Sequence, residues 1–227
     1  MKLKNLLSAL TPIALLPILM IAGCTNHPSN PDQIVGSGRL ISEARSLPAF
    51  SGIQVTGTAK VVIKQDTVQS LRIEADDNIM DRISTSVSNG LLVIGLQQGS
   101  YNNITINVYA SMKTIDRLEC VGTADFVTSG SIQTDQITCR VTGTGTMTLS
   151  GTATNQTIEL TGTGDIHNFG LLSNHCAATI TGTGNLEVNV TQQLDAVVSG
   201  SGSIIYAGNP GVVNRMIAGI GSVRPKS

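Results

Sequence analysis

Aromatic and charged residues are both scarce in this chain of 227 residues. It has no tryptophan, three tyrosines and three phenylalanines. A compact globule with a thick two-layer core usually buries more aromatic area, so burial must depend mainly on valine, isoleucine, leucine and alanine. Lysine and arginine number 14 against 15 aspartates and glutamates, so no overall charge attracts nucleic acid. This composition favours thin, repetitive β-structure and argues against a nucleic-acid partner.

Motifs for catalysis and for metal binding are also lacking. The sequence has no Gly-x-Ser-x-Gly elbow, no His-Glu-x-x-His, no phosphate-binding loop and no EF-hand loop. Beyond Cys24 there are three cysteines (Cys120, Cys139 and Cys176), an odd number that cannot all pair within the chain, and none forms Cys-x-x-Cys. We expect these three to be small buried apolar side chains, and we expect no metal and no cofactor.

The first 23 residues have the three parts of a secretory signal peptide. Lys2 and Lys4 supply a basic start, an apolar run extends from Leu6 to Ala22, and small residues end it. The run is short for a bilayer span of about 20 residues, and its two prolines weaken it as a helix. We therefore interpret residues 1–23 as a signal peptide that is removed during export.

The end of this segment, Ile21-Ala22-Gly23-Cys24, resembles the bacterial lipobox. The resemblance implies cleavage between Gly23 and Cys24, diacylglycerol on the Cys24 sulfur and an acyl group such as palmitate on its new amine. Two or three acyl chains hold firmly, because each buried methylene adds roughly 0.8 kcal/mol. The alternative is an ordinary signal followed by an incidental cysteine. Thr25 stands where inner-membrane retention signals often have aspartate, so we predict the outer membrane, with the domain facing the periplasm or the cell surface.

Residues 24–38 are predicted to be a flexible tether, because they are polar, contain Pro28 and Pro31 and show no apolar period. The folded domain is then expected over residues 39–227. Its size is enough for one domain with a substantial core.

A short phrase recurs along this domain. Its centre is a glycine, usually flanked by threonine or serine, and the spacing of these glycines is nearly constant from Gly122 to Gly219. A period of about 20 residues indicates stacked repeats. A leucine-rich repeat has a similar period, but its Leu-x-x-Leu framework is missing. The central glycines are Gly57, Gly122, Gly143, Gly162, Gly182, Gly200 and Gly219.

Apolar residues occupy fixed positions two before, four before and four after each central glycine, with few lapses such as Arg215. This alternation is typical of strands with one buried face, which such a unit buries only by stacking at about 4.8 Å per coil. The sequence predicts an all-β right-handed parallel β-helix, or solenoid, with regular repeats over about residues 115–223. The less regular β region before it either has longer coils or forms an antiparallel sheet that caps one end.

Several segments resemble a known family, the auto-transporter adhesin head GIN domain, a domain of unknown function. They are Phe50–Val55, Asp76–Met80, Asn89–Ile94 and the serial Gly-Thr-Gly phrases. The resemblance covers roughly residues 40–222 and implies a β-helical fold in envelope lipoproteins. It brings no catalytic motif, and the adhesin label is itself an inference from fold.

Three threonine pairs are the candidate binding face. They are Thr142 and Thr144, Thr161 and Thr163, and Thr181 and Thr183. If the glycine between them points inward, both neighbours point outward and recur about every 4.8 Å along the stack. This grid resembles the ice-binding faces of solenoid antifreeze proteins. The alternative is that β-branched residues simply suit exposed strands, and the glycines suggest a bend that would spoil a flat lattice.

Asp125, Asp165 and His167 are the candidates for catalysis, because parallel β-helices host polysaccharide lyases and hydrolases. Asp125 and Asp165 share a column, but two coils would separate them by about 10 Å, too wide for a retaining pair. We favour solvated polar residues and predict no enzyme. The leading hypothesis is a lipid-anchored, non-enzymatic binding or scaffold module, adhesin-like, whose partner is an envelope glycan or protein. The alternatives are a carbohydrate-active enzyme and an ice-binding protein.

Overall fold

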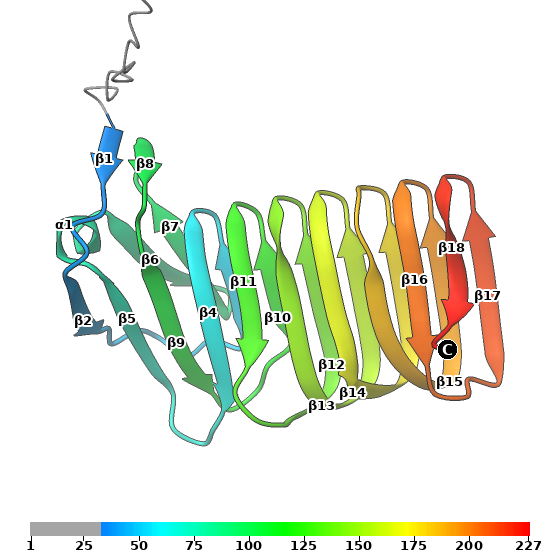
Figure 1. Cartoon of the computed structure of the whole chain (residues 1–227). Helices are drawn as coiled ribbons and strands as arrows, with labels where there is room; N and C mark the ends of the chain where they lie inside the picture. Colours follow the sequence, from blue (N-terminus) through cyan, green and yellow to red (C-terminus); the bar gives the residue numbers. More distant parts are fainter. Residues whose placement is uncertain (1–32) are drawn as a thin grey trace, which may run out of the picture. The chain divides into compact units, whose positions relative to one another are not determined.

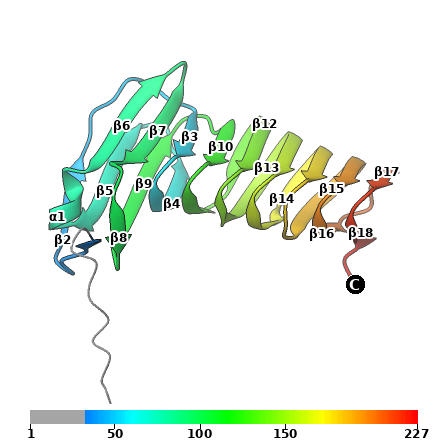
Figure 2. The same ribbon diagram turned by 90° about the horizontal axis from the view of Figure 1, so that it is seen from above.

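The computed structural model describes residues 33–227, which form an almost entirely β structure: a β-solenoid of about five turns preceded by an irregular N-terminal region. The predicted solenoid is thereby confirmed. In Figure 1 each coil descends along one face, crosses below, ascends along the other face and bends sharply at the top. Figure 2 shows the coils in a single row from β3 and β4 to β17 and β18.

Long parallel ladders join the coils on both faces. One face carries β4, β11, the first parts of β13, β14 and β15, then β16 and β18. The other carries β3, β10, β12, the later parts of β13, β14 and β15, then β17. The strands are β3 (Gly52–Val55), β4 (Thr58–Gln65), β10 (Arg117–Cys120), β11 (Thr123–Thr128), β12 (Ile132–Val141), β13 (Thr144–Leu160), β14 (Thr163–Ile180), β15 (Leu186–Val198), β16 (Ser201–Ala207), β17 (Val212–Ile217) and β18 (Ile220–Pro225).

The irregular N-terminal region contains antiparallel pairs, one of the two arrangements left open by the sequence. It comprises β2 (Leu40–Ala44), β5 (Ser70–Asp76), β6 (Ile83–Ser88), β7 (Leu91–Leu96) and β9 (Ile106–Met112), together with the short helix α1 (Asp77–Met80). β2, β5 and β9 extend one face and the β6–β7 hairpin extends the other. Asn89 (φ 51°) and Gly90 (φ 74°) form the hairpin turn, where positive φ suits Asn-Gly.

One strand falls inside the predicted tether. β1 (Gln33–Val35) pairs in parallel with β8 (Ser100–Asn102). Residues 33–35 are therefore part of the folded domain, which begins before the predicted boundary at residue 39. The polar composition of the segment did not reveal this, because its partner strand lies far along the chain, beyond β7.

The interior is a column of aliphatic side chains, as predicted from the alternation. Two residues before the central glycines, six side chains are at most 1% exposed: Val55, Cys120, Val141, Leu160, Ile180 and Val198. The seventh, Ile217, is 47% exposed, because within the described chain its coil is covered on one side only. The predicted stacking of equivalent positions is thus confirmed for every coil that has neighbours on both sides.

Candidate functional site

The six predicted threonines lie on both sides of a tight bend along one edge of the solenoid. Thr142, Thr161 and Thr181 precede the bend, their partners follow it, and all six are exposed. Equivalent residues stack in register from coil to coil through Thr123, Thr144, Thr163 and Ser201. We call this upper edge in Figure 1 the ridge. It consists of residues 56–58, 121–123, 142–144, 161–163, 181–183, 199–201 and 218–220.

Close contact between the backbones of successive coils explains the glycine at the centre of the ridge. A Cβ atom on Gly162 would lie 2.5 Å from the carbonyl oxygen of Thr142 and closer still to that of Gly143. Non-bonded carbon–oxygen contacts need roughly 3.3 Å. The N–H groups of Thr161 and Gly162 both donate to the carbonyl oxygen of Val141, at 2.9 and 3.1 Å. The bend is therefore held by main-chain hydrogen bonds, and side chains project only from its flanks.

The ridge is uncharged and curved. None of its residues is Asp, Glu, Lys or Arg. The hydroxyl of Thr142 donates back to the carbonyl oxygen of Cys120 at 3.3 Å, so part of its hydrogen-bonding capacity is used within the protein. Because the two threonine columns stand on either side of a bend, they do not form the flat grid that the ice-binding hypothesis requires.

The structure places Asp125 and Asp165 on one column with a coil between them. Asp125 is in register with Thr146, and Thr146 with Asp165. A carboxylate oxygen of Asp125 accepts hydrogen bonds from the N–H (3.2 Å) and hydroxyl (2.7 Å) of Thr146. A carboxylate oxygen of Asp165 likewise accepts from the N–H of Asn185 at 2.7 Å. Each carboxylate therefore bonds the next coil, and the two do not form a pair.

His167 is in register with Thr148, in the column next to that of Asp165. Its Nδ1 lies 2.9 Å from a carboxylate oxygen of Glu187 on the adjacent strand β15. The sequence reasoning missed Glu187. Its place one repeat after His167, in register on the following coil, could have revealed the pair. The arrangement links neighbouring coils and is exposed on the surface of the face.

A second polar column lies on the opposite face. Gln54 donates to a carboxylate oxygen of Glu119 (2.6 Å), and the Arg140 guanidinium bonds Glu119 (3.4 Å) and Glu159 (2.7 Å). Glu119 is only 7% exposed. The hydrogen bond to Glu159 raises the pKa of Arg140, which stays charged. This ladder joins four coils, and it contributes to coil stacking.

The three cysteines are buried and free, as predicted. Burial raises the pKa of the Cys139 thiol to about 12 and also raises the pKa of Cys120 and Cys176. Thiolates are the reactive form of cysteine, so these side chains are chemically inert in the native fold. Among residues 33–227, no group of three or more His, Cys, Asp or Glu residues is arranged to hold a metal ion.

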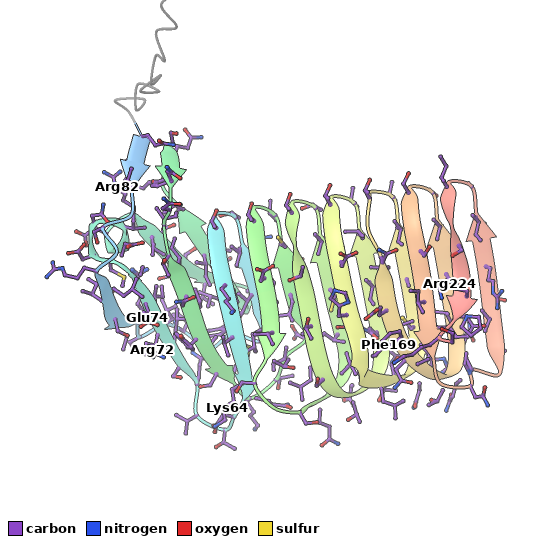
Figure 3. All side chains as sticks on the ribbon, in the orientation of Figure 1. Lys64, Arg72, Glu74, Arg82, Phe169 and Arg224 are labelled. Atoms are coloured by element: carbon purple, nitrogen blue, oxygen red, sulfur yellow. The ribbon has the colours of Figure 1, made fainter. Side chains whose placement is uncertain are left out.

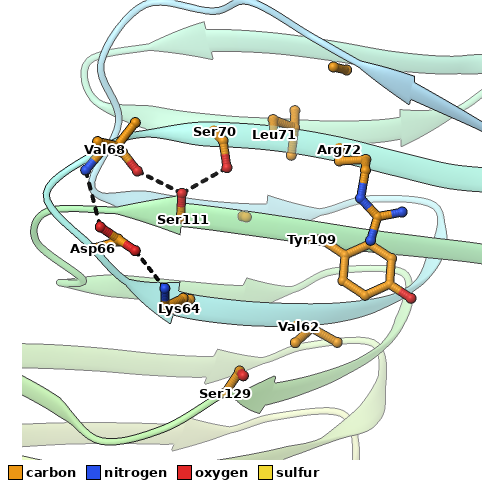
Figure 4. A pocket seen from close by; sticks show the side chains of 12 residues that line it. Val62, Lys64, Asp66, Val68, Ser70, Leu71, Arg72, Tyr109, Ser111 and Ser129 are labelled. Atoms are coloured by element: carbon orange, nitrogen blue, oxygen red, sulfur yellow. Dashed lines mark hydrogen bonds and ion pairs between the residues drawn. The ribbon is translucent and has the colours of Figure 1, made fainter.

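A groove of about 600 Å³ lies on the face where the parallel coils meet the antiparallel strands. It crosses β5, β9 and β4, whose order along the sheet differs from their order along the chain. Its floor includes Val62 and the ring of Tyr109, and Val68 stands at its rim, 70% exposed. Figure 4 shows the lining side chains along neighbouring strands, with Arg72 next to the Tyr109 ring and Lys64 bonded to Asp66. Its volume falls within the range of about 300–1,000 Å³ that is typical of small-molecule sites.

Polar groups along the groove are held in place by one another. Lys64 donates to Asp66 at 2.6 Å, and this bond together with the Val68 N–H holds the pKa of Asp66 below its ordinary value. Ser111 donates to the Val68 carbonyl oxygen at 2.7 Å and lies 2.8 Å from the Ser70 hydroxyl. These groups offer fixed donors and acceptors side by side with an apolar floor.

At the other end of the groove an arginine covers an aromatic ring. The Arg72 guanidinium carbon lies 3.9 Å from the centroid of Tyr109, and the Tyr109 hydroxyl donates to Glu74 at 3.2 Å. Figure 3 shows Arg72, Glu74 and Lys64 on the same side of the N-terminal region. Two cations and two carboxylates therefore balance one another around the groove, which favours a ligand without net charge.

The predicted cleavage and lipidation positions, Gly23 and Cys24, lie outside the described residues. Within residues 33–227 the structure contains no helix that is both long and apolar enough to cross a bilayer.

A family model now identifies the domain. The model of the "Putative auto-transporter adhesin, head GIN domain" matches residues 49–210, most of the chain. The chain belongs to this family. The resemblance seen in the repeated phrases is thereby confirmed, and an adhesin-like family suggests a protein of the cell envelope or surface.

Solved structures share the fold. A "putative adhesin" from Bacteroides fragilis is 23% identical with a TM-score of 0.69, over 85% of this chain and all of that one. A "putative lipid binding protein" from Parabacteroides distasonis (21%, TM-score 0.53) and a "putative adhesin" from Parabacteroides merdae (19%, 0.51) each match 86% of this chain and all of their own. At these identities the likeness establishes the fold alone. A comparison with curated proteins found no match.

Proposed function

We propose that this chain is a lipid-anchored protein of the bacterial envelope whose solenoid head binds a neutral glycan without catalysing a reaction. Membership of an adhesin-like family supports an envelope location. The lipobox-like sequence ending in Cys24 supports an anchor, and Thr25 favours the outer membrane. A binding role fits a rigid stack that holds side chains at fixed spacing.

The groove across β5, β9 and β4 carries the proposal. Sugar sites combine an apolar platform with closely spaced donors and acceptors, and the groove offers Val62 and Tyr109 beside Lys64, Asp66 and Ser111. Lys64 is paired with Asp66, and the Tyr109 ring that Arg72 covers donates its hydroxyl to Glu74. Each cation therefore already has a carboxylate nearby, so an anionic ligand would gain little from the two cations. A polyhydroxylated neutral ligand can exchange hydrogen bonds with all of these groups.

Binding of purified envelope polysaccharides and a glycan array test the proposal. Lys64→Ala should weaken binding by roughly tenfold, since a hydrogen bond to a charged group is worth about 1.5 kcal/mol. Lys60→Ala, on the same strand but outside the groove, is the matched control. If the two variants bound the glycan equally well, the binding site would not be this groove. Cleavage of a polysaccharide that stops on changing Asp125, Asp165 or His167 would replace a binding role by an enzymatic one.

The anchor is tested separately through Cys24. Cys24→Ala should abolish incorporation of labelled palmitate and release the protein from the outer-membrane fraction. The result would contradict the proposal if the variant were cleaved and remained with that membrane.

A further inference from the structure

The loop between β4 and β5, residues 66–69, holds an apolar side chain in solvent at the rim of the groove. Val68 is 70% exposed, whereas the tips of exposed loops usually carry small or polar residues. Its main chain is fixed on both sides. The Val68 N–H donates to Asp66 at 3.4 Å, and its carbonyl oxygen accepts from Ser111 at 2.7 Å (Figure 4). The place of this apolar side chain beside the groove is therefore set before a ligand binds.

Two glutamines tie the ends of the same loop to other parts of the chain. The Gln65 amide makes three hydrogen bonds of 2.6–3.0 Å with the main chain of Lys113 and Gln133. The Gln69 amide makes three hydrogen bonds of 3.0–3.3 Å with the main chain of residues 47–50. These bonds keep the loop in one conformation, so a ligand that contacts its tip loses little binding energy in ordering it.

The polar groups beside the loop divide into an acceptor and a donor. Ser111 uses its single hydroxyl hydrogen in the bond to the Val68 carbonyl oxygen, so the 2.8 Å contact between the two serine hydroxyls uses the hydrogen of Ser70. The Ser70 oxygen therefore keeps lone pairs but no free hydrogen. The Lys64 ammonium bonds Asp66 through one hydrogen and keeps others to donate.

The spacing of this acceptor and this donor fits an amide group. Ser70 on β5 and Lys64 on β4 are both in register with Ser111 on β9, which lies between them. Strands that are two apart in a sheet are separated by about 9.6 Å. The N–H and C=O of a trans amide point in opposite directions, and with a hydrogen bond of about 2.9 Å at each end the group spans about 8 Å. The flexible lysine stem can take up the difference.

We propose that the groove is specific for a glycan that carries an acetamido group, as N-acetylhexosamines do. The Ser70 oxygen accepts from the amide N–H, Lys64 donates to the acetyl carbonyl, and Val68 contacts the methyl group. The two substituents of a trans amide lie on opposite sides, so the sugar ring is directed towards Val62 and Tyr109 on the groove floor. The inference rests on the proposed glycan-binding role of the groove and names the chemical group that it recognises.

Calorimetric titration of the protein with two tetrasaccharides tests this specificity. One consists of β-1,4-linked N-acetylglucosamine, and the other consists of β-1,4-linked glucose, which has a hydroxyl in place of each acetamido group. The unmodified protein should bind the first roughly tenfold more tightly. Val68→Thr keeps the shape of the side chain but replaces a methyl group by a hydroxyl, and it should remove most of this preference. Val121→Thr, at a position 45% exposed on the ridge, is the matched control and should keep it.

The outcomes separate this assignment from the proposed function. If the protein bound both tetrasaccharides with the same affinity, or if the two variants changed the preference alike, the acetamido assignment would be overturned and the groove would remain a glycan site. If no neutral glycan bound at all, the proposed function would fail as well.

Sedimentation with isolated peptidoglycan then distinguishes two sources of the acetamido sugar. Sedimentation of the unmodified protein that Val68→Thr weakens would support the assignment with the cell wall as the source. Binding of the free N-acetylglucosamine tetrasaccharide without sedimentation would support it with a surface polysaccharide as the source.

Discussion

Replacing Gly162 by alanine tests the claim that backbone contact sets the spacing of the coils. The central glycine of each ridge bend lies against the carbonyl groups of the coil before it. A Cβ on Gly162 would be 2.5 Å from the Thr142 carbonyl oxygen and 2.6 Å from its carbonyl carbon. Both contacts are with main-chain atoms, so no side chain can rotate away to make room.

The expected loss of stability follows from what must move. Opening the bend stretches the hydrogen bonds from Thr161 and Gly162 to Val141 (2.9 and 3.1 Å) and from Thr163 to Gly143 (2.9 Å). Each such bond contributes about 1 kcal/mol, and overpacking itself costs about 1–3 kcal/mol. With all three bonds lost, Gly162→Ala should lower the free energy of unfolding by roughly 4–6 kcal/mol.

Guanidinium denaturation followed by circular dichroism measures this difference. Gly211→Ala is the matched control, because the nearest atom to its Cβ would be the Gln192 carbonyl oxygen at 3.8 Å. It should be neutral or stabilise the protein by about 0.4–1 kcal/mol, since alanine restricts the unfolded chain. If both variants unfolded at the same denaturant concentration, backbone crowding would not be what requires glycine on the ridge.

Three further substitutions or treatments probe the interior and the polar ladder. Iodoacetamide at neutral pH should label Cys139 and Cys176 only after denaturation, as measured by mass spectrometry. Because burial raises the pKa of each thiol, both stay protonated in the native state while they ionise in the unfolded chain above about pH 9. The free energy of unfolding should therefore fall as pH rises from about 9 towards 12. Arg140→Met, which leaves the buried Glu119 bonded only to glutamine, should lower stability by about 1–2 kcal/mol in urea melts, and an unchanged midpoint would count against the ladder. Gln156→Met should raise the Tm, since Gln156 is 1% exposed and both its amide atoms lack partners; a lower Tm would show that the amide is stabilising.

The regular coils were predictable because each repeat itself contains the residues that set its register. Each repeat has a central glycine at the crowded bend, a place that only glycine can occupy. The apolar residues stand at the same positions relative to this glycine in each repeat. Those two signals assign the positions two before, four before and four after each glycine to the interior, and the structure buries them in every coil from Gly122 to Gly200. They also identified the buried cysteines, and they placed a full coil between Asp125 and Asp165.

The groove could not be predicted in this way. Its side chains come from β4, β5 and β9, which lie in the stretch without the repeated phrase, so nothing local sets their register. The sheet order β5-β9-β4 depends on an antiparallel pairing between two strands that are distant in the chain. Only that pairing brings Arg72 over the Tyr109 ring and Ser70 beside Ser111.

The sequence by itself determined the stack: which residues face inward, how often the chain returns, and that threonines flank a glycine on the outside. Only the tertiary structure decided the shape of the outside. The same Thr-Gly-Thr phrase suits a straight strand or a sharp bend, and closure of the coil onto the carbonyls of its neighbour selects the bend. A narrow uncharged ridge results instead of a flat face, because long-range backbone packing, which no short segment encodes, sets the direction of the flanking side chains.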